Sequence, residues 1–482
     1  MIDNTSQNIL IVLLLLYGIG IIAYSYYFYR KTKTYDGYSM GGRAMPLLPM
    51  ILTIVGGAVG GSTLLGFMTD AYQFGMGQIW NVISLVLSVV IFILIFLKKI
   101  RIAGDKYKLS TVGDYAAIRF GKAARYPTFI GNLAAIAALA GLQFVALAGV
   151  LNLIFGLNIT TGIIISFLFL TVKTFLGGLT AVIWTDAVQG TIQTIGITSL
   201  FLFIYISTGG WENIADNVSN SNIIGSINPS EFLNPFNIPL GEILIPFLTI
   251  GAAILVRQDN WQRVWAAKDM NTIIKANWWS IVIIFFSGVF IIVLGVIAAT
   301  SLGINTSQPN LIYYEIIFGH LPFWFGAIML ITLMATILSI ADTFIISGST
   351  MIVNDLIKPL MKHQTDSKLL AYSRSMVFVM GLLSMILALA IPRLVELWMT
   401  GSAILVSGIL APILLGLLWK KPNNIAGVAS MWSGLIVAIS WQLLGHPFGL
   451  HPVFLGLPIS IIVLLVLTLI PVENKEYELE SN

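Results

Sequence analysis

Long apolar runs, each close to the length of a membrane-spanning helix, follow one another along almost the whole of this 482-residue chain. A helix needs about 20 mostly apolar residues to cross a bilayer. Hydrophobic residues make up 57% of the chain and charged residues only 10%, against roughly 25% charged residues in a soluble globular protein. This composition excludes a cytosolic enzyme, a nucleic-acid-binding protein and a disordered chain. We therefore expect an integral protein of the lipid bilayer.

The runs do not alternate between apolar and polar residues, which favours a bundle of helices over a β-barrel. The expected fold is an all-α polytopic membrane protein of about 13 transmembrane helices in one domain, 1–473, with a short cytoplasmic tail at 474–482. The helices are expected at about 8–28, 47–69, 78–97, 127–153, 160–175, 179–208, 239–256, 276–300, 322–351, 374–391, 394–419, 424–445 and 453–471.

The lysines and arginines predict how the chain is oriented in the plasma (inner) membrane. Asp3 and no cation precede the first run, whereas Arg30 and Lys31 follow it. Cytoplasmic loops carry an excess of Lys and Arg. If the thirteen helices alternate in direction, all but one of the 25 cations fall on the cytoplasmic side, the exception being Arg393. The N-terminus is then outside and the C-terminus cytoplasmic, and Lys173, Arg257 and Arg263 are among the cations expected in cytoplasmic loops.

Carboxylates inside the apolar runs are rare, because burying a charge in hydrocarbon is costly unless it is paired or faces water. Asp186 and Asp342 lie well inside their helices, and Asp70 lies near the end of its helix, where we expect contact with water. Two intramembrane carboxylates in a chain this poor in acids indicate a cation site or a proton relay. The alternative is a buried hydrogen bond to a neighbouring helix.

Thr336, Ser339 and Thr343 recur at i, i+3 and i+7, beside Asp342. This spacing places oxygen-bearing side chains on one helix face. A hard cation such as Na⁺ prefers several oxygen ligands, as the hard divalent ions do. The alternative is that these Ser and Thr side chains pack helices closely by bonding to backbone carbonyls.

Gly56, Gly57, Gly60 and Gly61 fall within six positions of one apolar run. Glycines at this density weaken a helix, and a helix broken at mid-membrane frees backbone groups to bind ions and substrate. The alternative is a close-packing face of small residues. A fainter interruption is expected around Pro246 and Gly251. The two breaks would begin two five-helix units of opposite orientation, 47–208 and 239–419, preceded by the extra helix 8–28 and followed by C-terminal helices at 424–471.

Four stretches, at 38–66, 177–190, 258–276 and 338–356, carry a family resemblance. They include VGGAVGG, GGLTAVIWTDAVQG, QDNWQRVWAAKD and LSIADTFIISGST, in this order. With the helix count, they make the chain similar to the sodium:solute symporter family, and closest to branches that include choline-transporter-like members. The resemblance implies a LeuT-type fold, which has a 5+5 inverted repeat with one extra N-terminal and two extra C-terminal helices.

The resemblance also implies the ion and solute sites. One sodium site would take backbone carbonyls from Gly56 and Val59 and side chains from Thr336 and Ser339, although Ile340 stands where the family usually has a hydroxyl. A second would use Asp186, Ser339, Asp342 and Thr343, and we favour it over the first. The polar residues placed to face a central solute cavity are Ser62, Gln78 and Gln143.

Simpler interpretations exist for Gln143 and for two tryptophans that could act as gates. Gln143 could instead bridge two helices, and Trp80 and Trp261 are expected as interfacial anchors rather than gates. The QRVWAAKD stretch is expected to form a cytoplasmic loop.

The expected function is Na⁺-coupled symport of a small polar organic solute by alternating access, with Na⁺ as the coupling ion and no enzymatic activity. One alternative keeps the fold but couples to protons, since Ile340 offers no oxygen. A remote alternative is a membrane-embedded sensor or enzyme. No nucleic acid and no obligatory protein partner is expected.

Overall fold

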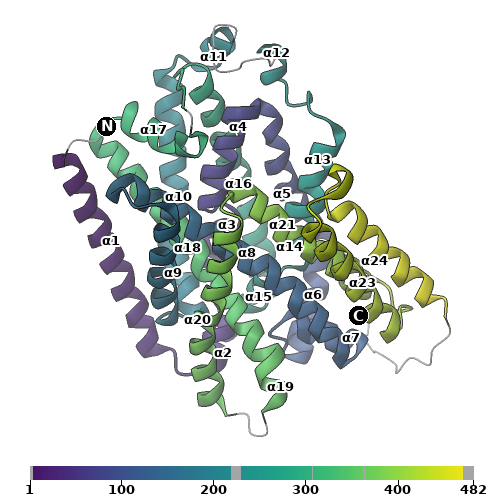
Figure 1. The fold of residues 1–482 in the computed structure, drawn as a ribbon. Helices are drawn as coiled ribbons and strands as arrows, with labels where there is room; N and C mark the ends of the chain where they lie inside the picture. Colours follow the sequence, from purple (N-terminus) through teal and green to yellow (C-terminus); the bar gives the residue numbers. More distant parts are fainter. Residues whose placement is uncertain (1–3, 219–228, 307, 362–364, 471–482) are drawn as a thin grey trace.

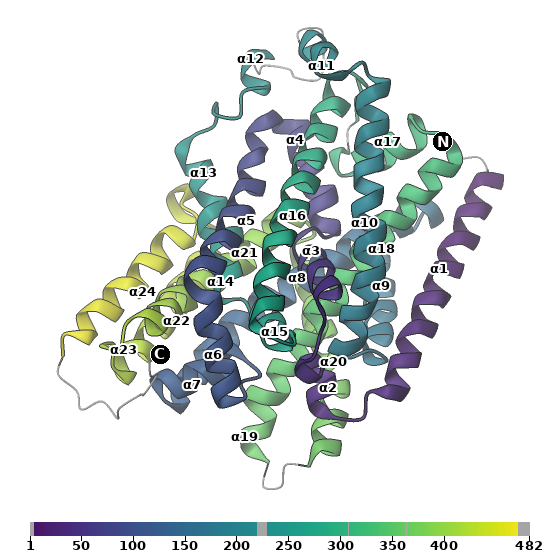
Figure 2. The same ribbon diagram turned by 180° about the vertical axis from the view of Figure 1, so that it is seen from behind.

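A computed structural model describes residues 4–218, 229–306, 308–361 and 365–470. These residues form a bundle of helices, and the β-structure among them is one isolated bridge between Met45 and Ala267 (Figures 1 and 2). The expected all-α membrane fold is thereby confirmed. Ten helices are long and apolar enough to cross a membrane, and three shorter apolar helices accompany them. The exact count of thirteen spans stays a prediction, and the tail 474–482 lies outside the described residues.

Each of the thirteen expected apolar runs is helical, with bounds close to those expected. The corresponding helices are α1 (Asn4–Lys31), α3 (Leu47–Ala58), α5 (Ile79–Ile91), α8 (Arg125–Phe155), α9 (Ile159–Phe175), α10 (Leu179–Ser207), α13 (Leu240–Pro246) with α14 (Ala252–Val256), α16 (Met270–Ala299), α18 (Phe323–Met351), α20 (Asp366–Ala390), α21 (Leu394–Leu405) with α22 (Ala411–Leu418), α23 (Asn424–Leu443) and α24 (Val453–Thr468).

Helix α18 lies at the centre of the bundle. Every residue in 332–351 is buried, including the polar residues Ser339, Asp342 and Thr343, so this helix is surrounded by other helices on all sides. It packs against α3, α8 and α10, and α16 packs against α3 and α10. Helix α1 lies along one edge of the bundle, and the α23–α24 pair lies along the opposite edge (Figures 1 and 2). The short helices α2 (Tyr35–Met40) and α19 (Lys358–Leu360) mark one end of the bundle, which we call the α2–α19 end.

The glycine-rich run breaks its helix, as predicted. α3 ends at Ala58, Val59 has non-helical dihedral angles (φ −106°, ψ 83°), and the helix resumes after Gly60. The hydroxyl of Thr63 donates to the Ala58 carbonyl and accepts from the Gly60 N–H, so it bonds polar groups freed by the break. The chain then continues through a π-helical turn (Thr63–Phe67) into α4 (Met68–Phe74).

The same glycines let other elements approach closely. A Cβ at Gly56 would lie 2.8 Å from the hydroxyl of Ser339, and one at Gly60 would lie 2.6 Å from Cδ1 of Ile340. A Cβ at Gly57 would lie 2.8 Å from Nη2 of Arg263. Both readings of the glycine run therefore hold, since the run breaks a helix and also forms a close-packing face.

The second break differs from the prediction in its place. The stretch around Pro246 and Gly251 is a continuous helix with a π-helical segment, Phe247–Gly251. The helix breaks instead at Arg257, whose backbone is extended (φ −75°, ψ 134°) between α14 and α15 (Gln258–Ala266). Pro246 is the seventh residue of this helix and directly precedes the π-helical segment.

Several cations expected in cytoplasmic loops are buried. Lys173 lies inside α9 and is fully buried, and Arg257 and Arg263 lie at the α14–α15 break, each 3% exposed. The QRVWAAKD stretch, expected as a loop, contains most of helix α15, because buried partners compensate its charges. The basic segment 98–126 contains two helices, α6 (Lys98–Tyr107) and α7 (Val112–Phe120).

Candidate functional site: a buried carboxylate between three helices

Asp186 of α10 is the centre of a buried polar cluster. Its Oδ1 accepts a hydrogen bond from the hydroxyl of Ser339, and its Oδ2 accepts from the hydroxyls of Thr53 and, at 3.5 Å, Thr343. All four side chains are at most 2% exposed. The i, i+4 spacing of Ser339 and Thr343 places them on one face of α18, and this face meets α3 and α10. The structure therefore brings together three of the four residues predicted for the second sodium site.

Arg263 approaches the same cluster from α15. Its Nε donates to the Thr53 hydroxyl (3.3 Å), its Nη2 donates to the Thr343 hydroxyl (3.1 Å), and its Nη1 donates to Asp259 (2.8 Å). The two threonine hydroxyls thus donate to Asp186 and accept from Arg263. Gly57 leaves the space that the guanidinium group fills.

Asp342, the fourth predicted residue of that site, has other partners. Its Oδ2 lies 2.5 Å from Nζ of Lys173, and its Oδ1 accepts a 2.6 Å hydrogen bond from Thr174. Lys173 also donates to the Leu338 carbonyl. This pair was not predicted from the sequence, because the lysine comes at the end of an apolar run and resembles a loop cation.

The residues predicted for the first sodium site lie near the α3 break, but they bond elsewhere. The Val59 carbonyl accepts a 2.8 Å hydrogen bond from Gln193, and the Thr336 hydroxyl donates to the Thr332 carbonyl of its own helix. Gly56 packs against Ser339, and Ile340 fills the space beside Gly60.

Two of the three predicted solute residues lie together. Nε2 of Gln143 is 3.5 Å from the Ser62 hydroxyl, beside the break, and Oε1 of Gln143 is buried without a partner among the described residues. Gln78 lies apart from them, on the turn before α5, where it accepts a hydrogen bond from Asn81. Trp261 is fully buried and donates to the Leu255 carbonyl, so it is not an interfacial anchor.

A cavity of about 30 Å³ adjoins the break of α3 on the side of α5, α14, α15 and α16. Such a volume holds about two water molecules. Its polar lining residues are Arg257, Asn260, Arg263 and Asn277. These residues were not predicted from the sequence, although two arginines within a few residues of an apolar run are a signal for a buried polar group.

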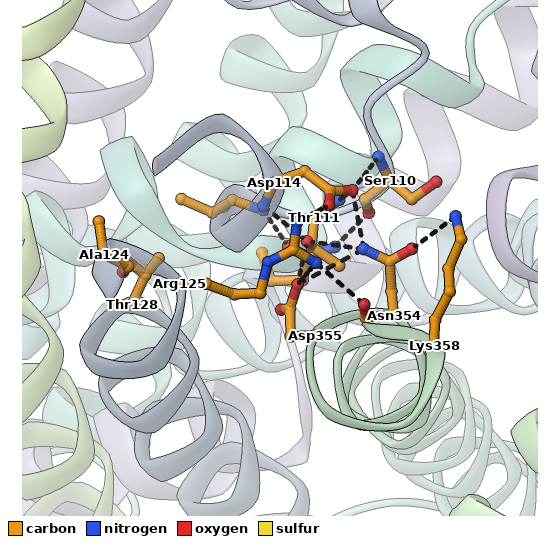
Figure 3. A network of polar contacts seen from close by, with 11 residues as sticks. Ser110, Thr111, Asp114, Ala124, Arg125, Thr128, Asn354, Asp355 and Lys358 are labelled. Carbon is orange, nitrogen blue, oxygen red and sulfur yellow. Dashed lines mark hydrogen bonds and ion pairs between the residues drawn. The ribbon is translucent and has the colours of Figure 1, made fainter. Parts of the chain in front are cut away.

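A second polar network links α7 and α8 to the π-helical continuation of α18, toward the α2–α19 end (Figure 3). The buried Asp355 accepts a 2.7 Å hydrogen bond from the Thr111 hydroxyl and lies 3.4 Å from Arg125. Arg125 also pairs with Asp114 (2.9 Å), which accepts from Asn354 (2.7 Å). These contacts hold together two segments that lie far apart in the chain.

Comparisons with known proteins agree with this architecture. The chain is 24% identical over 472 residues to the sodium/pantothenate symporter of Escherichia coli (strain K12), covering 94% of this chain and 95% of that protein. It is 24% identical over 478 residues to the sodium/proline symporter of the same organism, covering 94% and 91%. A Na⁺-coupled sialic acid symporter, solved in a substrate-bound outward-open state, has the same fold, with a TM-score of 0.80, 17% identity and coverage of 95% and 96%.

The pattern of one family extends over most of the chain. The sodium:solute symporter family matches residues 38–434, which contain both breaks, Asp186 and all of α18. This match favours a transporter over the sensor and enzyme alternatives, and Na⁺ over protons as the coupling ion. The affinity to choline-transporter-like branches stays a prediction. The chain belongs to the sodium:solute symporter family.

Proposed function

We propose that this protein carries a small polar organic solute together with Na⁺ by alternating access, and that Na⁺ binds beside Asp186. The observation that carries this site is the convergence of three hydroxyl groups, from Thr53, Ser339 and Thr343, on one buried carboxylate. Hydroxyl and carboxylate oxygens are the ligands that a hard cation prefers. Thr53 joins the residues inferred from the family resemblance.

Asp342 has a different role in this proposal. Its negative charge is compensated by Lys173, so it supplies no net charge to an ion at Asp186. We assign it to holding α18 against α9, which keeps Ser339 and Thr343 aligned with Asp186. The site formed by Gly56, Val59 and Thr336 remains the second candidate for Na⁺, and it would require Gln193 to release the Val59 carbonyl.

Arg263 compensates the charge of Asp186 when Na⁺ is absent. The guanidinium group uses the threonine lone pairs that Na⁺ would need, so ion binding and the withdrawal of Arg263 go together. Because Arg263 belongs to α15, this exchange couples the ion to the helix break that borders the cavity.

The solute is placed between the α3 break and the α14–α15 break. Ser62 and Gln143 would meet it on one side of α3, and the residues of the 30 Å³ cavity would meet it on the other. Gln78 would contact it only on entry, since it lies beyond these residues at the end of α5. A cavity of this size must widen before an organic solute fits.

The proposed orientation places the N-terminus outside and the α2–α19 end in the cytoplasm, in the plasma membrane. It is supported by the exposed cations of this end, among them Lys31, Lys99 and Lys368. The proposed repeats are 47–208 and 239–419, each beginning with an interrupted helix. Lipid is the surrounding partner, and we propose no obligatory protein partner.

The test of the ion site uses purified full-length protein in detergent, with NaCl titrated against KCl at constant ionic strength. We expect Na⁺ to raise the unfolding temperature. In Asp186→Asn, the apparent affinity for Na⁺ in this titration should be at least 100-fold weaker. Asp216→Asn is the control, since Asp216 is an exposed carboxylate on α11 (Gly210–Val218), outside the cluster. An unchanged Na⁺ response in Asp186→Asn would contradict the site. Pantothenate and proline, named for two relatives, are the first solutes to test in proteoliposomes.

A further inference from the structure

The break between α14 and α15 holds two buried guanidinium groups that share one carboxylate. Arg257 binds Asp259 through Nε (2.5 Å) and Nη2 (3.0 Å), and Arg263 binds the same carboxylate through Nη1 (2.8 Å). All three side chains are at most 4% exposed. This group therefore carries one positive charge in excess, and a buried charge is costly unless it is compensated.

Asp186 supplies that compensation only while Na⁺ is absent. Arg263 bonds to Thr53 and Thr343, and both threonines bond to Asp186, so one carboxylate offsets the excess guanidinium charge. The other buried pair nearby, Lys173 and Asp342, is neutral by itself. Once Na⁺ neutralises Asp186, the positive charge of the arginine pair has no partner among these groups.

The cavity beside the arginines is lined by groups that suit an anion. Arg257 and Arg263 border it together with Asn260 and Asn277, and no Asp or Glu lines it among the described residues. Trp398 also lines it, and the indole N–H of Trp398 is buried without an acceptor in the described part of the chain. The fork of an arginine matches the two oxygens of a carboxylate.

The remaining walls of the cavity are apolar. Leu85, Phe92 and Ile284 face it from α5, its π-helical continuation (Phe92–Leu97) and α16. Such walls exclude water from the arginines, which strengthens their attraction for an anion, and they suit a small organic body.

We propose that the co-transported solute is a carboxylate-bearing organic anion, bound by Arg257 and Arg263 at the α14–α15 break. This inference rests on the proposed Na⁺ site at Asp186. Na⁺ and the carboxylate then bind cooperatively, because each compensates the charge that the other leaves uncompensated. Coupling between ion and solute follows from this charge balance.

The first test needs no knowledge of the solute. Arg257→Gln removes the excess charge but leaves Asp259 paired with Arg263. In the absence of solute we expect this variant to bind Na⁺ more tightly than the wild type, on the order of tenfold. Arg257→Lys retains the charge, so its Na⁺ affinity should equal that of the wild type. Lys99→Gln, which removes an exposed positive charge, is the matched control and should change nothing.

The second test uses matched pairs of solutes, in NaCl and in KCl, with thermal shift as the readout. The pairs are pantothenate and pantothenol, and lactate and lactamide. We expect stabilisation only by carboxylates and only in Na⁺, at least tenfold weaker affinity for their neutral partners, and loss of carboxylate binding in Arg257→Gln.

The outcomes separate the inference from the function on which it rests. If Na⁺ has no effect on the wild type, the proposed ion site itself fails. If Na⁺ binds but Arg257→Gln leaves its affinity unchanged or lower, the charge balance is overturned. A neutral amide or alcohol that binds as tightly as its carboxylate would overturn the solute class.

Discussion

Lys173 of α9 and Asp342 of α18 form an ion pair with a separation of 2.5 Å between Nζ and Oδ2, although 169 positions separate them in the chain. Neither side chain is more than 4% exposed. The pair compensates the charge of Asp342, whereas no lysine or arginine bonds directly to Asp186 among the described residues. This difference in partners is the reason that we propose Asp186, and not Asp342, as the ligand of the transported ion.

Removing one partner of this pair should be strongly destabilising. In Lys173→Met, Asp342 keeps Thr174 but loses its counter-charge, and we expect a loss of about 3–5 kcal/mol in the free energy of unfolding. The double variant Lys173→Met/Asp342→Asn removes both charges and should recover most of that loss. Denaturant unfolding in detergent measures both. Equal losses in the single and double variants would show that the lysine contributes packing rather than charge.

Arg263→Gln should raise the affinity for Na⁺ at least tenfold. The change removes the donor that uses the Thr53 and Thr343 lone pairs and leaves Asp186 without a positive neighbour. Solute uptake should fall, because the ion no longer displaces a group of α15. Arg263→Lys retains the charge and serves as the control. A lower Na⁺ affinity in Arg263→Gln would mean that the guanidinium group supports the ion site instead of competing for it.

Gly60→Ala should destabilise the protein by about 1–3 kcal/mol, because the new Cβ would lie 2.6 Å from Cδ1 of Ile340. Adding Ile340→Val removes that Cδ1 and should restore part of the loss. Gly20→Ala is the matched control, since nothing lies within 4 Å of its Cβ in α1, and it should be neutral or slightly stabilising. Thermal unfolding of the three variants provides the comparison. A destabilised Gly60→Ala that Ile340→Val fails to relieve would point to the backbone of the break.

We expect His451, in the turn between α23 and α24, to make the protein less stable in acid. Burial, and secondarily the neighbouring His446, lowers the pKa of His451 to about 4, below its ordinary value of 6.5. Protonation therefore favours the unfolded state. The contribution of the neutral His451 side chain to the free energy of unfolding is therefore complete above pH 6.5 and decreases as the pH falls toward 4. The decrease is roughly 2 kcal/mol after allowance for the partial exposure of the ring. The free energy of unfolding, measured at several pH values from 7 to 4, should change less with pH for His451→Gln than for the wild type. An equal pH dependence of the free energy of unfolding in the two proteins would show that other groups cause the acid sensitivity.

The sequence predicted the helices closely, because the length and apolarity of a run are local properties. The break at Gly56–Gly61 and the face shared by Ser339 and Thr343 were also predictable, since glycine content and the 3.6-residue period act within one segment. The second break was misplaced. Arg257 has no intrinsic tendency to end a helix, and its extended backbone depends on buried partners.

The sequence by itself determined a bundle of apolar helices, a weakened helix at the glycines and two carboxylates too costly to bury without partners. Only the tertiary structure decided which partners they have. Thr53 of α3 bonds to Asp186, and Arg263 of α15 bonds to Thr53 and Thr343 beside it. Lys173 of α9 bonds to Asp342. The physical reason is that helix formation depends on neighbours within a few residues. The compensation of a buried charge depends instead on side chains that packing brings together from segments far apart in the chain.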